Sequence, residues 1–121
     1  MSQIKVYGYE KCSTCRKAYG FLEKKKVSFE KIPIVDQPPT LSELRAMLNE
    51  TGDVRKLFNT SGQMYREMKL GDKLKTMSEG EALKLLSQHG KLVKRPFVVG
   101  SGHRAKGLVG FKEDLWKKAF S

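Results

Sequence analysis

The sequence lacks any long hydrophobic run, any internal repeat and any low-complexity segment. No stretch approaches the roughly 18 apolar residues that span a bilayer, so no membrane association is expected. The first residues hold no apolar run of signal-peptide length, which favours a cytoplasmic protein. With 121 residues, 39% of them hydrophobic, and no visible linker, the chain suits one domain, 1–121, and we expect a monomer.

Cysteine and histidine are also scarce, with two of each. Cys12 and Cys15 alone cannot complete a tetrahedral zinc site. His89 and His103 stand too far apart for the short histidine spacing typical of zinc sites. We therefore expect no metal and no bound cofactor. A disulfide between Cys12 and Cys15 would close too small a loop to stabilise the fold much, so the pair is read as redox-active.

Acidic residues are outnumbered, 13 against 24 basic ones, which gives a net charge of +11. This excess favours an acidic protein partner, an anionic substrate or nucleic acid, although it can also serve solubility alone. The basic residues are scattered, and no stripe of basic residues interleaved with aromatic ones is present. Direct nucleic-acid binding is therefore not expected.

Apolar alternation and helical spacing predict an ordered series of strands and helices. Gly52 is expected to break one helix, and Gly90 to cap the C-terminus of another. The expected elements are strands at 4–7, 28–35, 97–99 and 105–109, and helices at 13–26, 40–50, 54–58, 64–68, 79–89 and 112–120.

The order of these elements predicts an α/β fold. A β-α-β start implies parallel strands and a right-handed crossover, and the last two strands suit an antiparallel hairpin. The expected closure is a thioredoxin-like (glutaredoxin-like) mixed four-stranded sheet. A helical insertion at about 40–90 would lie between the second and third strands.

Cys12 and Cys15 form a CxxC motif between the first strand and the first helix. The unpaired N–H groups and partial positive charge of a helix start favour a thiolate, as do neighbouring cations. We therefore expect a lowered pKa for Cys12, aided by Lys11, Arg16 and Lys17. Cys15, one turn later and more buried, would resolve the mixed disulfide that Cys12 forms. Two ordinary half-buried cysteines are the alternative.

Arg95 and Pro96 come directly before the third strand. A cis proline beside a redox site would let the backbone approach a bound thiol or peptide, whereas an ordinary proline here would only begin a strand. Arg95 would hold an anionic substrate near Cys12, or would be a solvated surface charge.

Six short segments of the sequence form a recognisable set: Cys12-Ser-Thr-Cys15-Arg-Lys-Ala18, Gln37-Pro-Pro-Thr40, Phe58-Asn-Thr-Ser-Gly62, Tyr65-Arg-Glu67, Lys94-Arg-Pro96 and Gly110-Phe-Lys-Glu-Asp114. Together they resemble the ArsC/Spx family of thioredoxin-fold proteins, over essentially the whole chain. The resemblance implies that the bond before Pro96 is cis.

Glutaredoxin-type arsenate reductases of this family use one cysteine, matched by Cys12, and three arginines that bind the oxyanion. Arg95 matches one of these arginines, whereas Asn59 and Gly110 stand at the other two positions. Arg104 or Lys106 could substitute only if the loop were rearranged. The resemblance therefore points away from arsenate as the substrate.

Spx-type members carry the same CxxC motif and act as redox-switched transcription regulators. They bind the C-terminal domain of the RNA polymerase α subunit through a glycine in the helical block, and Gly52 falls near that position. A glycine that merely ends a helix would stand at the same place.

Two hypotheses follow. The first is a cytoplasmic thiol–disulfide oxidoreductase in which Cys12 attacks, Cys15 resolves, Pro96 shapes the substrate groove and Arg95 contacts an anionic group. Its electrons would come from thioredoxin or a low-molecular-weight thiol. The second is a non-enzymatic regulator that binds the RNA polymerase α subunit, with Gly52 as the contact and the Cys12–Cys15 disulfide as the switch.

Overall fold

A computed structural model describes residues 4–100 and 107–120. Contacts divide the chain into two compact units, and each is described by itself. The first is made of residues 1–33 and 95–121, and the second of residues 34–94. The second unit covers the segment expected as the helical insertion.

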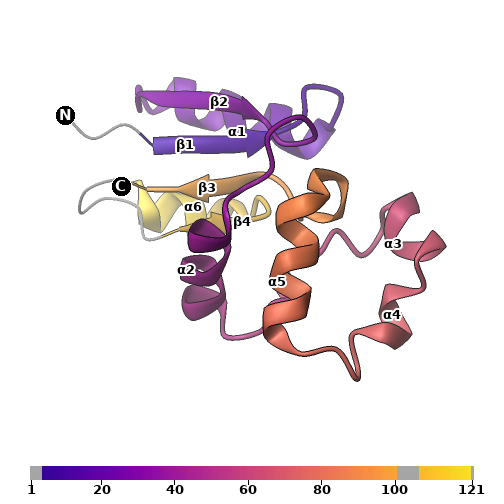
Figure 1. The fold of residues 1–121 in the computed structure, drawn as a ribbon. Helices are drawn as coiled ribbons and strands as arrows, with labels where there is room; N and C mark the ends of the chain where they lie inside the picture. The colour runs from indigo at the N-terminus through magenta and orange to yellow at the C-terminus, as the bar shows by residue number, and fades with distance from the viewer. Residues whose placement is uncertain (1–3, 101–106, 121) are drawn as a thin grey trace. The chain divides into compact units, whose positions relative to one another are not determined.

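The first unit is built on a four-stranded sheet in the order β2-β1-β3-β4 (Figure 1). β1 pairs in parallel with β2, and β3 pairs antiparallel with both β1 and β4. The predicted mixed sheet is therefore confirmed. Of the fourth strand expected at 105–109, Leu108 and Val109 form β4, and 105–106 lie outside the described residues. The strands are β1 (Ile4–Gly8), β2 (Phe29–Pro33), β3 (Phe97–Val99) and β4 (Leu108–Val109).

Helices α1 (Ser13–Lys24) and α6 (Glu113–Ala119) pack against the sheet. α1 ends before the predicted 26, because Lys26 takes a left-handed φ of 59°. Trp116 is 1% exposed and donates its indole N–H to the Gly110 carbonyl over 3.1 Å. Alternate residues of β1 face the two helices and form one core cluster with them. Its buried members are Ile4, Val6, Cys15, Ala18, Tyr19, Leu22, Val98, Trp116 and Phe120.

The second unit, all of whose residues are described, consists of short helices and turns. Both longer helices of this unit begin with a capping box, Thr40 with Glu43 and Ser78 with Glu81. The unit also contains α4 and η2, which the sequence pattern did not predict. Its elements are α2 (Leu41–Thr51), η1 (Val54–Leu57), α3 (Gln63–Glu67), α4 (Leu70–Lys73), α5 (Glu79–Gln88) and η2 (Gly90–Leu92).

The two glycines expected at helix ends play different parts. Gly52 caps α2 with a left-handed φ of 77°, as predicted. The prediction for Gly90 was wrong, because α5 is capped by His89 in an extended conformation. Gly90 instead begins η2 and lies against the backbone of Ile34, where a side chain would have no room.

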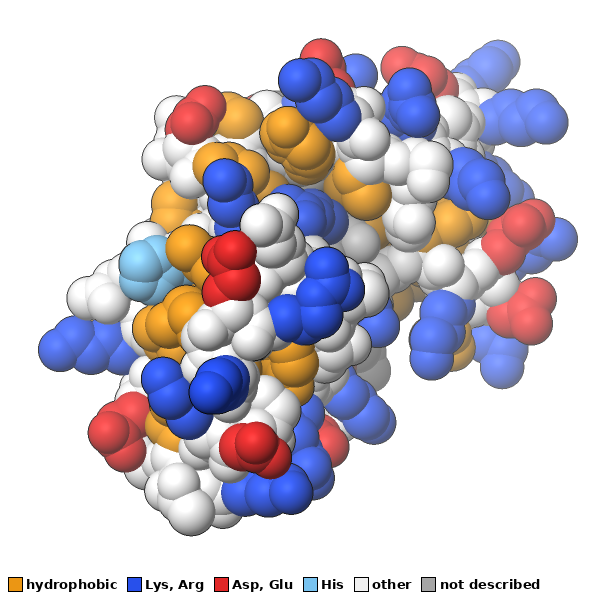
Figure 2. Space-filling model, turned by 90° about the vertical axis from the view of Figure 1, so that its right-hand side faces the viewer, with side chains coloured by type: hydrophobic (Ala, Val, Ile, Leu, Met, Phe, Trp, Pro, Cys, Tyr) orange, Lys and Arg blue, Asp and Glu red, His pale blue; other side chains and the backbone are white. Residues whose placement is uncertain are grey.

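Charged side chains are spread over the face seen in Figure 2 and do not gather into one basic patch. Lysines and arginines predominate there, with aspartates and glutamates among them. No helix among residues 4–100 and 107–120 is both long and apolar enough to cross a bilayer.

Candidate redox site

The two cysteines occupy the first turn of α1 in different surroundings. Cys12 is the N-cap residue and is half-buried, whereas Cys15 is 0% exposed. The Cys12 N–H donates to the Tyr9 carbonyl over 2.9 Å, and the Cys12 carbonyl accepts from Arg16 N–H over 3.1 Å. These bonds fix the loop that leads from β1 into the helix. Both thiols are free.

The pKa of Cys12 is lowered from its ordinary value, as predicted. Burial is the largest single influence and opposes ionisation, but several weaker influences together outweigh it. These are the N–H groups of Cys15 and Thr14, the Cys15 thiol and the positive charge of Arg95. The cation is therefore Arg95, rather than Lys11, Arg16 and Lys17, whose side chains are exposed.

Cys15 is affected in the opposite direction, and its pKa is raised to about 12. Burial is the main cause, and the hydrogen bond and negative charge of Cys12 add to it. The Tyr9 N–H, 3.4 Å from the Cys15 sulfur, and the charge of Arg95 act against this rise. The pair thus consists of one easily ionised outer thiol and one protonated inner thiol.

Arg95 and Pro96 lie in the same unit as the cysteines. β3 runs antiparallel to β1 with Phe97 opposite Tyr7, so residues just before β3 reach the end of β1 that leads into Cys12. The peptide bond between Arg95 and Pro96 is cis, as the resemblance implied. Pro96 is buried, and its carbonyl accepts from Gly110 N–H over 2.8 Å.

Arg95 also lies over the ring of Tyr9, with its guanidinium carbon 5.7 Å from the ring centroid. A cation at this distance is attracted by the face of the ring. Because Tyr9 begins the loop that ends at Cys12, this contact holds the positive charge beside the redox pair.

Neutralising Arg95 is expected to shift the pH dependence of thiol attack. The thiolate is the nucleophile, so the rate rises with pH and levels off above the pKa of Cys12. Arg95→Gln removes a charge that lowers this pKa, so the inflection should move to higher pH. At neutral pH the rate should fall by less than about tenfold, because a more basic thiolate is also intrinsically more reactive. The measurement is the rate of reaction with an aromatic disulfide reagent across the pH range.

Arg95→Lys is the matched control for this experiment, since it keeps the charge but not the planar guanidinium. It should retain most of the wild-type pH profile. An Arg95→Gln profile that overlays the wild-type one would show that Arg95 has no electrostatic effect on Cys12.

Three contributors to the site carry no recognisable sequence signal. Tyr9 donates its backbone N–H to the Cys15 sulfur, which any residue but proline could do, and its ring lies under the Arg95 guanidinium. Gly8 acts through its missing side chain, because a Cβ there would collide with the Tyr19 hydroxyl and lie 3.3 Å from the Cys15 sulfur. Tyr19 has the helical spacing of an ordinary core residue, so the sequence pattern gives no sign that its hydroxyl lies at the site.

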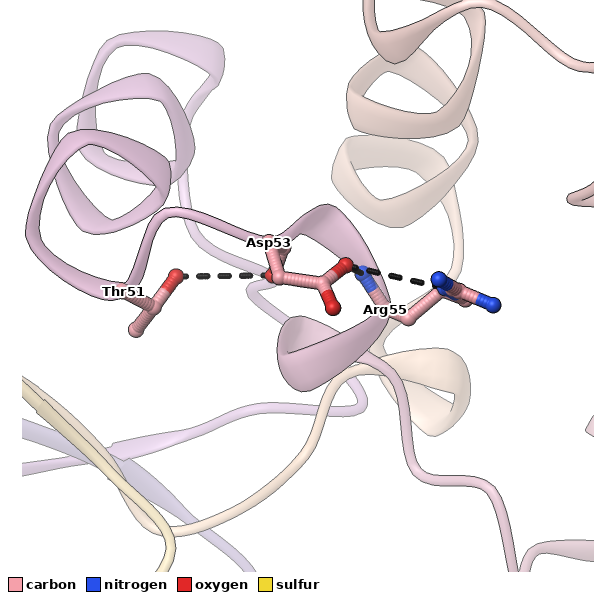
Figure 3. Close-up of polar contacts among 3 residues, drawn as sticks. All are labelled: Thr51, Asp53 and Arg55. Carbon is pink, nitrogen blue, oxygen red and sulfur yellow. Dashed lines mark hydrogen bonds and ion pairs between the residues drawn. The ribbon is translucent and has the colours of Figure 1, made fainter.

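Gly52 and Asn59 belong to the second unit. Gly52 is exposed, and a Cβ added to it would meet nothing within 4 Å. The turn around it is held by the Thr51 hydroxyl, which donates to the Asp53 carbonyl over 3.5 Å (Figure 3). The Asp53 carboxylate accepts from Arg55 N–H over 2.9 Å and lies 3.7 Å from the Arg55 side chain.

The other positions considered for ligands are only partly covered by the described residues. Arg104 and Lys106, considered as substitutes for the oxyanion arginines, lie outside the described residues, as does His103. Within the described part of the chain, no three histidine, cysteine or acidic side chains come together in an arrangement that could hold a metal. The backbone of Asn59 is tied to its own unit, with its N–H donating to the Leu92 carbonyl over 2.7 Å.

Comparison with known proteins gives matches along nearly the whole chain. YusI of Bacillus subtilis, an uncharacterized protein, is 46% identical over 95% of this chain and 96% of its own. An arsenate reductase of Neisseria meningitidis is 29% identical over 88% of this chain and 92% of its own. The global transcriptional regulator Spx 1 of Lactococcus lactis is 30% identical over 90% of this chain and 84% of its own.

The structural comparison agrees with these matches. The crystal structure of an ArsC-family-related protein from Bacteroides fragilis superposes with a TM-score of 0.87 and 44% identity, covering 97% of each chain. The thioredoxin-like fold expected from the sequence is thereby confirmed. A family model described as the ArsC family matches residues 7–119. The chain is therefore a member of the ArsC family.

Proposed function

We propose that this protein is a cytoplasmic thiol–disulfide oxidoreductase that works through Cys12 and Cys15. The observation that carries the proposal is the opposite behaviour of the two thiols. The pKa of the half-buried Cys12 is lowered, and that of the buried Cys15 is raised to about 12. Cys12 is readily ionised and can attack, whereas Cys15 stays protonated until the second step.

The reaction has two steps. The Cys12 thiolate attacks one sulfur of a substrate disulfide, forming a mixed disulfide and releasing the other sulfur as a thiolate that takes a proton from solvent. The Cys15 thiol then loses its proton, and its sulfur attacks Cys12. The Cys12–Cys15 disulfide forms, and the substrate leaves as a second thiol. Two electrons pass from the protein dithiol to the substrate.

The first step itself prepares the second. Two of the influences that raise the pKa of Cys15 are the negative charge and the hydrogen bond of Cys12. Both influences change once the Cys12 sulfur is bound in a mixed disulfide, because that sulfur then carries no negative charge. The attraction of Arg95 and the Tyr9 N–H remain, so the pKa of Cys15 falls when its thiolate is needed.

Arg95 and Pro96 are the residues that we assign to the substrate. The positive charge of Arg95 next to Cys12 suits a disulfide that bears an anionic group. We rank arsenate below such a substrate, because Asn59 and Gly110 stand where arsenate reductases have two arginines. The electrons would come from thioredoxin or a low-molecular-weight thiol, and the chemistry needs no bound cofactor.

The test of the proposal is turnover. The reduced protein, supplied with thioredoxin and its reductase or with a low-molecular-weight thiol, should reduce a disulfide substrate repeatedly. A Cys12–Cys15 potential far below that of the cytosolic thiol pool would mean a permanently oxidised pair, and the proposal would then fail.

A redox-switched transcription regulator is the second candidate. It is supported by the likeness to Spx 1 and by the open space in front of Gly52, which would let a partner approach the backbone closely. The partner under this candidate is the C-terminal domain of the RNA polymerase α subunit. Binding should then differ between the dithiol and disulfide forms.

Substitution of Gly52 separates the two candidates. Gly52→Arg fills the open surface, but it also costs about 1–2 kcal/mol of unfolding free energy because of the left-handed φ. Gly52→Asn fills the same surface with a side chain that tolerates this conformation. A regulator should lose binding to the purified α-subunit domain in both variants. For the oxidoreductase we expect no binding in the wild type and full turnover in Gly52→Asn.

A further inference from the structure

Tyr19 stands one helical turn after Cys15, so the two side chains share a face of α1. Tyr19 is only 6% exposed. Its ring stacks on Phe29 with the centroids 5.9 Å apart and an interplanar angle of 10°. The Lys31 ammonium lies 4.6 Å from the ring centroid. These contacts fix the ring and therefore fix the position of its hydroxyl.

Gly8 shows where that hydroxyl lies. A Cβ built on Gly8 would collide with the Tyr19 oxygen and stand 3.3 Å from the Cys15 sulfur. The Tyr19 oxygen and the Cys15 sulfur therefore both lie close to the α-carbon of Gly8, at the end of β1. The Tyr9 N–H already donates to that sulfur over 3.4 Å. The buried thiol is thus bordered by a backbone donor and a nearby phenol.

A cavity of about 430 Å³ lies next to this cluster, and Gly8, Tyr9 and Tyr19 form part of its wall. Exposed side chains of Glu10 and Lys11 also line it. Cys15 itself is 0% exposed and is not among the lining residues. Tyr19 therefore touches both the cavity and the surroundings of the buried sulfur.

The resolving step places a negative charge on the buried Cys15 sulfur. Cys15 must lose its proton while it is shielded from water, and an unpaired buried charge is costly. Among the described residues that line the cavity, Glu10 is the one carboxylate, and its side chain is exposed. The buried sulfur therefore needs a nearby donor that stabilises its charged form.

We propose that Tyr19 is a positioning residue for the resolving step, whose hydroxyl stabilises the Cys15 thiolate after the thiol has given its proton up to solvent. This inference rests on the proposed oxidoreductase function. The Cys15 sulfur then bonds to Cys12, the bond from Cys12 to the substrate sulfur breaks, and the departing thiolate is protonated from solvent. Tyr19 keeps its own proton throughout, since burial raises its pKa to about 12.

Other charges around this pair affect the same titration. Glu10, Cys15 and Cys12 act on the Tyr19 hydroxyl, and Cys12 and Arg95 act on Cys15. They remain unchanged when only the Tyr19 oxygen is removed. Among the described residues, Cys12, Glu10 and Arg95 act on the pair electrostatically, Lys31 lies over the Tyr19 ring, and Lys11 lines the same cavity.

The experiment measures the resolving step alone. Cys12 is loaded with an aromatic thiol as a mixed disulfide, and release of that thiol is followed across the pH range. Tyr19→Phe keeps the ring and removes the oxygen. We expect release at neutral pH to slow about tenfold, the lower end for a lost hydrogen bond to a charged group, and its pH inflection to move upward. The initial attack of Cys12 should change much less.

Tyr65→Phe is the matched control, because it removes a tyrosine hydroxyl from the second unit, where the ring packs on Phe58. It should release the thiol at the wild-type rate. A Tyr19→Phe variant with wild-type release and an unshifted inflection overturns the inference. If the wild-type adduct does not release its thiol at all, the proposed function fails instead.

A second measurement keeps the inference testable if Tyr19→Phe folds poorly. In Cys12→Ser, Cys15 is the sole thiol, and its pKa can be followed by thiolate absorbance. Adding Tyr19→Phe to this variant should raise the pKa of Cys15. An unchanged value contradicts the stabilising role.

Discussion

Cys15→Ser is expected to convert the protein from a turnover catalyst into a trap for its substrate. Cys12 keeps its position at the N-cap of α1, so it still attacks a disulfide. The serine hydroxyl cannot displace the bound thiol, and the mixed disulfide accumulates. Cys12→Ser should instead react with the disulfide more slowly than the wild type by about a thousandfold or more.

The difference between the two variants follows from the depth of the two sulfurs. Cys12 is half-buried and can meet a substrate, whereas Cys15 is 0% exposed and can meet only Cys12. A symmetric pair would give two traps, one for each single variant. We therefore expect a stable adduct in Cys15→Ser alone, seen as a mass increase of the intact protein that a reducing agent removes.

Ser13→Ala is the control for disturbance of the first turn, because Ser13 is exposed and begins α1 without contributing a thiol. It should turn over like the wild type. An adduct that forms equally on Cys12→Ser would assign the attack to Cys15 and reverse the proposed roles.

The chemistry of Cys12 could be predicted from sequence because its causes are local. A strand, a short loop and a helix start place the thiol next to free N–H groups, and Thr14 and Cys15 supply them. The acting cation could not be read from its neighbours. Arg16 and Lys17 are close in sequence but exposed, whereas Arg95 comes to the site through the pairing of β3 with β1.

Contacts that depend on backbone approach were also beyond the sequence. The collision that a Cβ at Gly8 would cause appears only when β1 and α1 are packed together. Gly90 follows a helix, so the sequence pattern predicts a cap. Glycine is required at this position because the backbone of Ile34, a residue far away in the chain, lies against it. Local sequence patterns predict the type of each element well. They predict poorly where segments distant in the chain come into close contact.

Gly90→Ala is expected to have the largest effect on stability of any single methyl group added to the second unit. The new Cβ would collide with the Ile34 carbonyl oxygen and stand 2.7 Å from its carbon and 3.0 Å from the Val35 α-carbon. All three are backbone atoms, which cannot rotate away as a flexible side chain can. Overpacking of this kind costs about 3 kcal/mol or more of unfolding free energy.

Gly80→Ala is the matched control, since Gly80 lies in the first turn of α5 with nothing within 4 Å of an added Cβ. It should be neutral or stabilising by about 0.5 kcal/mol, because alanine loses less backbone freedom than glycine on folding. Thermal unfolding should place Gly90→Ala about 10 °C below the wild type. If both variants melt at the wild-type temperature, the chain has room at Gly90 and η2 does not press on Ile34. Gly90 would then be an ordinary turn glycine after all.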